Sequence, residues 1–219
     1  MTADDLPGGL ARVPPSRKGA LRKTAIIDAT LRLISAGGLQ GVSMRTVAAE
    51  ADLPLGTVTY YFKDKGELIE AAFLRHTQAE TARVVAAISR IGEDLTGAQL
   101  AARLADFVVQ GLTTHRAQLV VEYQFLCEST RQESLQRASA AWLQSLLAHL
   151  EATVRALASA QPRTDARLLL AVLAGLEVDN LAVPLDAAGE QAVRHLVGRL
   201  LDVLQRTWAD EGAQSASAS

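Results

Sequence analysis

The chain has 219 residues, of which 49% are hydrophobic and 21% charged, as in globular proteins that bury a sizeable core. Its longest apolar run, at residues 168–176, is too short to cross a bilayer, and the N-terminus lacks the apolar stretch of a signal peptide. A single cysteine, Cys127, excludes an intramolecular disulfide. We therefore expect a cytoplasmic protein with no membrane partner.

Positive charge is concentrated in the first third of the chain. All four lysines lie in the first 65 residues, and residues 12–65 contain nine basic and four acidic residues. That segment therefore carries +5, and the remainder carries −7 of the total charge of −2. A basic module joined to an acidic one is expected when only one end of a protein meets phosphate.

The N-terminal elements begin after a polar stretch. Residues 1–16 are rich in proline, glycine and small polar residues, which predicts a disordered arm. A helix follows from about residue 21, because Ile26 and Ile34 belong to an i, i+3/i+4 apolar stripe, and Gly37-Gly38 ends it. Ser43 is a favourable N-cap for a short helix that reaches Ala51.

A second short helix begins near Pro54, which suits a first helical turn, and runs to about Phe62 with Val58 on its buried edge. Asp64 then caps a long helix that reaches about residue 90. Two short helices joined by a tight turn form a helix-turn-helix, whose second helix enters the major groove of DNA. The sequence therefore predicts a DNA-binding domain over residues 17–66. The alternative is that this segment is only a corner of a helical bundle.

Beyond residue 66, only helical periods occur. Helices are predicted at about 100–112, 116–128 and 132–159, then from Thr164 to residue 183, and finally along the stripe from Val193 to Trp208. Small polar residues at 211–219 predict a disordered tail. The predicted fold class is all-α, with about nine helices and a second helical domain at residues 67–210.

Residues 48–65, AAEADLPLGTVTYYFKDK, resemble the TetR family of bacterial transcription regulators. The resemblance covers about residues 21–73 and implies a helix-turn-helix domain followed by a helical ligand-binding and dimerisation domain. Two residues depart from the family pattern. Asp52 replaces the usual turn glycine, but aspartate tolerates a left-handed backbone. Thr59 replaces a common tyrosine, which leaves base preference open.

Placement on the helices identifies candidate DNA contacts. The side of the second helix opposite Val58 and Phe62 faces outward, Arg45 lies early in the first helix, and Lys65 lies near a helix N-terminus that suits phosphate. Tyr61 also suits the core, with only its hydroxyl group at the surface. The predicted set is Lys18, Arg22, Ser43, Arg45, Leu55, Gly56, Thr57, Thr59, Tyr60, Tyr61, Lys63 and Lys65.

Residues 168–183 are apolar on nearly all sides, and the last helix carries a wide apolar stripe. Two such helices from each of two chains would form a four-helix interface, unless they only complete the core of one chain. The residues predicted for a homodimer interface are Leu169, Val172, Leu173, Val193, Val197, Leu200 and Leu204.

A ligand pocket in the second domain is implied by the resemblance. Candidate lining residues are Leu104, Phe107, Tyr123, Phe125, Cys127, Trp142, Leu146, Leu176 and Asn180. Glu122 could select a cation, but we interpret it as an exposed residue beside Arg116. No metal site, cofactor motif or catalytic constellation is predicted, so we expect no enzyme activity.

These features predict a ligand-responsive DNA-binding regulator. Its partners are a double-stranded operator of palindromic sequence, a second copy of the chain and a small, largely apolar effector, and repression is the expected mode. The alternatives are a TetR-like activator and an all-helical ligand-binding protein or enzyme without DNA affinity.

Overall fold

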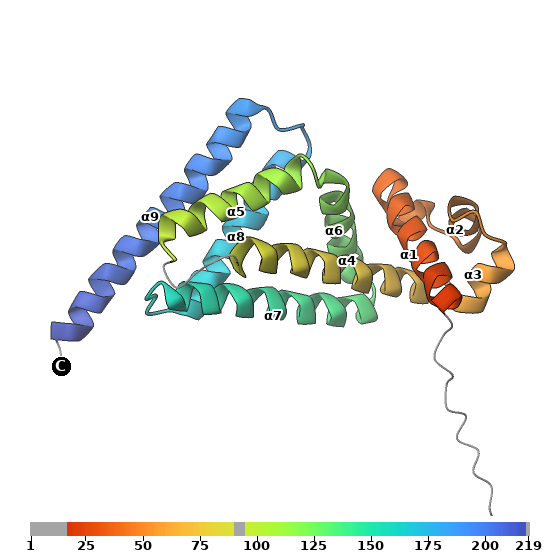
Figure 1. The fold of residues 1–219 in the computed structure, drawn as a ribbon, viewed down its shortest axis with the longest axis horizontal. Helices are drawn as coiled ribbons and strands as arrows, with labels where there is room; N and C mark the ends of the chain where they lie inside the picture. Colours follow the sequence, from red (N-terminus) through yellow and green to blue (C-terminus); the bar gives the residue numbers. More distant parts are fainter. Residues whose placement is uncertain (1–16, 90–94, 218–219) are drawn as a thin grey trace, which may run out of the picture.

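A computed structural model describes residues 17–89 and 95–217, and every regular element in that part of the chain is helical (Figure 1). The predicted all-α class with about nine helices is confirmed for these ranges. The predicted arm at residues 1–16 lies outside them. None of the described helices is long and apolar enough to cross a membrane. The helices are α1 (Arg17–Gly37), α2 (Met44–Glu50), α3 (Leu55–Tyr61), α4 (Lys65–Ser89), α5 (Gly97–Leu112), α6 (Arg116–Ser129), α7 (Glu133–Ala156), α8 (Pro162–Leu181) and α9 (Ala187–Ser217), with a 3-10 turn, η1 (Leu39–Gly41).

Helix α4 connects the two ends of the molecule. Helices α1–α3 lie at one end and the C-terminal half of α9 at the other, while α4 runs from the first end into the helical body beside α7 (Figure 1). Its apolar residues divide between two cores. Leu68, Ile69 and Phe73 belong to an N-terminal core with the buried residues of α1–α3, whereas Ile88 belongs to a body core formed mainly by α5, α8 and α9.

The N-terminal core also includes residues from the body. Val121 and Phe125 of α6 and Leu135 of α7 are buried in it, and the rings of Phe73 and Phe125 meet edge to face at 5.2 Å. Phe125, predicted to line a ligand pocket, is instead completely buried at this junction. A domain boundary at residues 66 and 67 stays a prediction, but side-chain packing crosses it.

The body core contains most of the residues predicted for the dimer interface. Leu169, Leu173, Val193, Val197 and Leu204 are all less than 9% exposed within a single chain. The apolar stripe of each helix faces its own neighbours, because α9 packs along α5 and α8 packs along α7. Val172 and Leu200 are only half-buried.

Helix α9 extends further than the sequence predicts. It ends at Ser217, so residues 211–217 are helical and the predicted disordered tail at 211–219 is corrected over that range. Trp208 anchors this part of the helix, since its ring is buried and its Nε1 donates to Asp165 Oδ2 at 2.6 Å. Glu211 also accepts a hydrogen bond from Gln161 Nε2 at 2.9 Å.

Candidate nucleic-acid interface and ligand pocket

The helix-turn-helix begins with a capping box at Ser43. The Ser43 hydroxyl accepts a hydrogen bond from the Thr46 amide at 3.1 Å, and Thr46 Oγ1 accepts from the Ser43 amide at 2.8 Å. These two bonds satisfy donors that the start of α2 would otherwise leave open. Asp52, in the turn between α2 and α3, has φ 51, so the left-handed backbone predicted from the missing glycine is confirmed.

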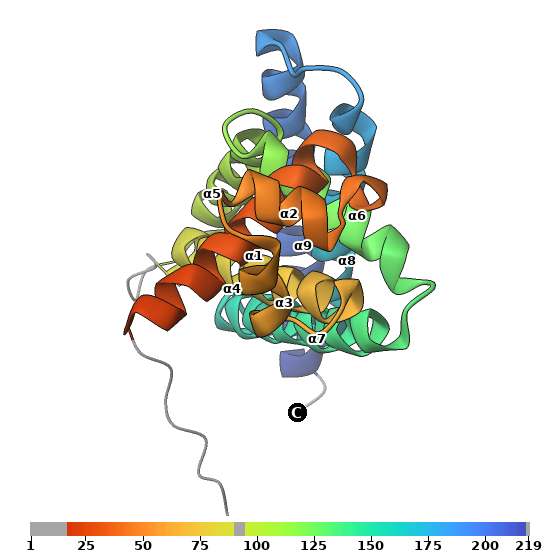
Figure 2. The ribbon, with the colours of Figure 1, turned by 90° about the vertical axis from the view of Figure 1, so that its right-hand side faces the viewer.

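One face of α3 is buried and the opposite face is open. Val58 and Phe62 are at most 1% exposed, whereas Tyr60 is 81% exposed and Leu55 is 42% exposed. Gly56 and Thr59 are also exposed, and Thr57 is half-buried. Tyr61 packs partly against the N-terminal core, with its ring edge to face with that of Tyr60 at 5.1 Å. Figure 2 looks onto the end of the molecule that α1–α3 form.

Exposed basic side chains lie on the helices next to α3 and directly after it. Lys18, Arg22, Arg45 and Lys63 are exposed. Lys65 differs, because its Nζ donates to the carbonyl of Leu39 at 2.9 Å and thereby holds η1 against α4. The phosphate contact predicted for Lys65 therefore competes with a structural bond.

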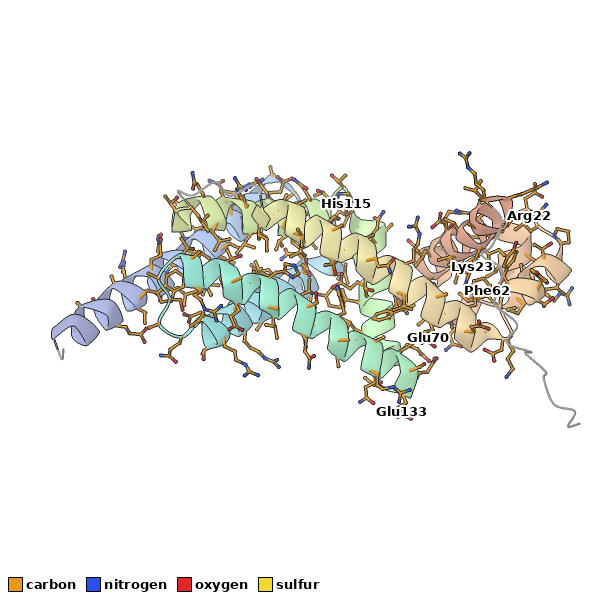
Figure 3. All side chains as sticks on the ribbon, turned by 60° about the horizontal axis from the view of Figure 1, so that its bottom comes forward. Arg22, Lys23, Phe62, Glu70, His115 and Glu133 are labelled. Atoms are coloured by element: carbon orange, nitrogen blue, oxygen red, sulfur yellow. The ribbon has the colours of Figure 1, made fainter. Side chains whose placement is uncertain are left out.

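Two further contacts hold the basic module together. The Nζ of Lys23 lies 5.4 Å from the ring centroid of Phe62, and Figure 3 shows the two side chains close together. Arg32 of α1 pairs with Glu50 of α2 through Nε and Oε1 at 2.6 Å. The first contact braces the end of α3 and the second braces α1 against α2, so the open face of α3 is presented from a fixed support.

A cavity lies inside the body, enclosed by α4, α5, α6, α7 and α8. It provides about 80 Å³ to water-sized molecules and is mostly apolar. Leu104, Phe107, Trp142 and Leu146, four of the nine residues predicted to contact ligand, line it. The complete lining is Glu80, Arg83, Val84, Ala87, Ile88, Leu104, Phe107, Leu119, Glu122, Trp142, Leu146, Leu150, Leu170, Leu173, Ala174 and Glu177.

The other predicted lining residues have different positions. Cys127 is exposed, because it lies on the outward side of α6. Leu176 is buried in the body core, and Asn180 donates through Nδ2 to the Leu176 carbonyl at 2.8 Å. Tyr123 contacts the cavity indirectly, since its hydroxyl lies 3.1 Å from both the Ala174 carbonyl and Glu177 Oε2.

Three carboxyl groups from three helices meet in the apolar cavity wall. Glu80 and Glu177 are 4% and 7% exposed, and the Glu122 side chain is 17% exposed. Glu122 is therefore not the surface residue that its sequence neighbourhood suggests. Burial, followed by the charge of Glu80, raises the pKa of Glu122 from 4.5 to about 8. Burial, followed by the charge of Glu122, likewise raises the pKa of Glu177 to about 8. Both groups therefore carry protons at neutral pH.

Arg83 is the principal counter-charge in this wall. Its Nη1 lies 2.6 Å from Glu80 Oε2, and its guanidinium carbon lies 4.7 Å from the ring centroid of Phe107. His76 lies on the side of Glu122 toward the N-terminal core, with Nε2 3.7 Å from Glu122 Oε2. That nitrogen is buried without a hydrogen-bond partner, and burial is the main cause of the lowered pKa of His76.

Sequence reasoning missed Glu80, Arg83 and Glu177 as cavity residues. Glu80 and Arg83 form an i, i+3 pair on α4, which looks the same in sequence as a solvent-exposed pair. Glu177 did give a usable signal. It is one of two acidic residues in the run 168–183, which is apolar on nearly all sides, and a carboxylate in a buried helix needs a partner.

The chain is similar to known proteins over most of its length. Residues 26–72 match the family model for bacterial regulatory proteins of the tetR family, and residues 95–203 match that for the tetracyclin repressor-like C-terminal domain. The curated HTH-type transcriptional regulator BetI of Burkholderia thailandensis is 44% identical over 72 residues, which are 32% of this chain and 37% of that protein. The match thus spans little more than a third of the curated relative.

Solved structures match a larger share. A member of the TetR family from Streptomyces coelicolor A3 is 34% identical, with a TM-score of 0.67, over 82% of this chain and 97% of that one. The multidrug binding protein EbrR complexed with ethidium is 34% identical, with a TM-score of 0.64, over 82% and 98% of the two chains. EbrR complexed with malachite green is 33% identical, with a TM-score of 0.64, over 82% and 97%.

Proposed function

The chain belongs to the tetR family of bacterial regulatory proteins, and from that membership we propose that it is a dimeric repressor released from operator DNA by a small molecule. The observation that carries the DNA-binding role is the open face of α3 together with exposed cations on α1, on α2 and directly after α3. A repressor of this kind works in the cytoplasm, where bacterial DNA lies.

Gly56 supports close approach of DNA to α3. A Cβ added at Gly56 would have no protein atom within 4 Å, and Gly56 is not among the positive-φ glycines. Neither packing nor backbone conformation therefore requires glycine there, although glycine weakens a helix. Close approach of the DNA backbone to α3 accounts for the glycine at position 56. In a dimer, two such helices would enter successive major grooves about 34 Å apart.

The second copy of the chain is proposed to dock on the exposed sides of α8 and α9. Leu168, Val178, Leu196 and Val203 are between 44% and 53% exposed, although they are large and apolar. Between them Gly175 is open to solvent, and a Cβ added there would meet no protein atom within 4 Å, which permits close helix packing. This surface replaces the buried residues that sequence periodicity selected, and two copies would form a four-helix interface.

The cavity chemistry favours a lipophilic organic cation as the effector. Phe107 and Trp142 supply aromatic surfaces, and Glu80, Glu122 and Glu177 supply carboxyl groups in a mostly apolar wall that also includes Arg83. A cation in the cavity would stack on the aromatic rings and favour the ionised form of Glu122 and Glu177, whereas a neutral apolar molecule makes neither interaction. EbrR, solved with ethidium and with malachite green, supports this ligand class.

The test is a mobility-shift titration on the region upstream of the protein's own gene, at two salt concentrations and with scrambled DNA as control. Sequence-dependent retention that tetraphenylphosphonium abolishes is the expected result, since this cation is lipophilic but does not intercalate. Equal retention of both DNAs would reject the operator role. Specific retention unaffected by the cation would reject the ligand class alone.

A further inference from the structure

Arg83 lines two neighbouring cavities. The cavity described above and a second, more open cleft both include Arg83, Ala87 and Phe107 in their linings. The second cleft, completed by residues of α4 and α5 with His115 at the corner before α6, has a volume of about 430 Å³ (His115 is labelled in Figure 3). The Arg83 and Phe107 side chains are therefore a shared wall between an enclosed pocket and a wide entrance.

The contacts of Arg83 are those that a ligand cation needs. Its guanidinium group stacks on the face of Phe107 and pairs with the buried carboxylate of Glu80. We infer that Arg83 is a resident cation that closes the ligand pocket, and that an organic cation enters by displacing its guanidinium group into the neighbouring cleft. This inference rests on the proposed ligand class and makes the Arg83–Glu80 pair the contact that a ligand has to replace.

The size of the cavity requires such a movement. Ligand pockets for drug-sized molecules measure about 300–1,000 Å³, whereas the enclosed cavity provides about 80 Å³. Displacement of one long side chain joins this cavity to the 430 Å³ cleft without unpacking a helix. The displaced guanidinium group then enters a cleft whose lining includes Arg103 and the half-exposed carboxylate of Asp106, which pairs with Arg194. Water in the open cleft supplies the remaining solvation.

Selectivity follows from the charge that Arg83 leaves behind. When a cationic ligand takes its place, Glu80 exchanges one positive partner for another and stays compensated. When a neutral ligand takes its place, Glu80 becomes a buried carboxylate without a counter-charge, which is strongly unfavourable. Removal of Arg83 should therefore tighten cation binding, because the ligand then pairs with Glu80 without first breaking the Arg83–Glu80 pair.

The test is a fluorescence titration of the DNA-free protein with ethidium, in wild type, Arg83→Met and Arg83→Lys. Arg75→Met is the matched control, because Arg75 also lies on α4 and pairs with a carboxylate, Asp28, but lies outside the pocket. We expect Arg83→Met to bind ethidium about tenfold more tightly, since the ligand no longer competes with a charge pair and a cation–π contact. Arg83→Lys should bind about two- to fivefold more tightly, because lysine cannot stack a planar group on Phe107.

The outcomes separate the two proposals. Tighter ethidium binding by the Arg83 variants, with the affinity of Arg75→Met unchanged from wild type, supports the resident cation. The same holds if the Arg83 variants bind ethidium and wild type does not. Ethidium binding in wild type that is equal or weaker in both folded variants overturns it. No ethidium binding in any variant rejects the proposed ligand class and the resident cation with it, while sequence-dependent DNA retention would leave the repressor role standing. Arg83→Lys keeps the charge beside Glu80, so the test stands if Arg83→Met fails to fold.

Discussion

Substituting Glu122 by glutamine should change how stability depends on pH. In the unfolded chain this carboxyl group ionises near 4.5, whereas in the fold it keeps its proton up to about pH 8. The unfolded chain therefore binds fewer protons in this window, and the stability of the wild type falls as the pH rises from about 4.5 to about 8. Glutamine does not ionise, so this contribution to the fall in stability with rising pH is absent from the variant.

The expected magnitude follows from the two pKa values. Each tenfold change in proton affinity is worth about 1.4 kcal/mol. Between pH 5.5 and pH 8.5 the unfolding free energy of Glu122→Gln should therefore rise relative to wild type by about 3 kcal/mol, with the change complete near pH 8. Part of the gain comes from Glu177, because the charge of Glu122 contributes to the raised pKa of that group.

Urea unfolding followed by circular dichroism at several pH values measures this difference. Protein concentration must be held fixed, because the apparent stability of the proposed dimer depends on it. Glu70→Gln, the same substitution at a residue of α4 outside the cavity (labelled in Figure 3), is the control. Parallel pH profiles for wild type and Glu122→Gln would refute the reasoning.

Three further predictions concern DNA binding and assembly. Gly56→Ala should raise the unfolding free energy by about 0.5–1 kcal/mol, because alanine favours a helix. The same substitution should weaken operator binding about tenfold. Unchanged affinity in a mobility-shift assay would show that DNA contact does not explain this glycine. Lys63→Ala should lower the slope of log affinity against log salt by about 0.9 for one lost phosphate contact. Lys65→Met should mainly lower the melting temperature, because it breaks the hydrogen bond to the Leu39 carbonyl. Equal salt slopes for wild type and Lys63→Ala would contradict the phosphate contact of Lys63. Leu196→Glu with Val203→Glu should give monomers in sedimentation velocity with helicity retained, and a dimer of this variant would place the interface elsewhere.

The helix-turn-helix was predicted accurately because its sequence signals are local. Ser43 caps α2, Asp52 takes a left-handed backbone and Val58 and Phe62 are buried, because each of these outcomes depends on residues a few positions away. The interior of the body was harder to predict. Periodicity identified the buried stripe of α8 and α9 correctly, but it does not tell whether a stripe faces its own chain or a second copy.

The pocket was only partly predictable for a related reason. Large apolar residues such as Phe107 and Trp142 were identified because few residues of that size occur in the body. The decisive polar groups come from α4, α6 and α8, and they converge only after the long-range packing of those helices. Glu80 and Arg83 therefore look like an ordinary surface pair until the fold places Phe107 above them.

The packing of α4 limits how this protein can be recombined with its relatives. Leu68, Ile69 and Phe73 bury the underside of the helix-turn-helix, and Phe125 and Leu135 complete the same core from α6 and α7. A chimera cut at residue 66 would therefore leave apolar surface uncovered on both fragments. A hybrid regulator that joins this helix-turn-helix to a different ligand-binding domain has to include the first half of α4. It also has to rebuild the contact surface of α6 and α7 on the recipient, so operator specificity and effector specificity are exchanged most safely by changing residues within each core.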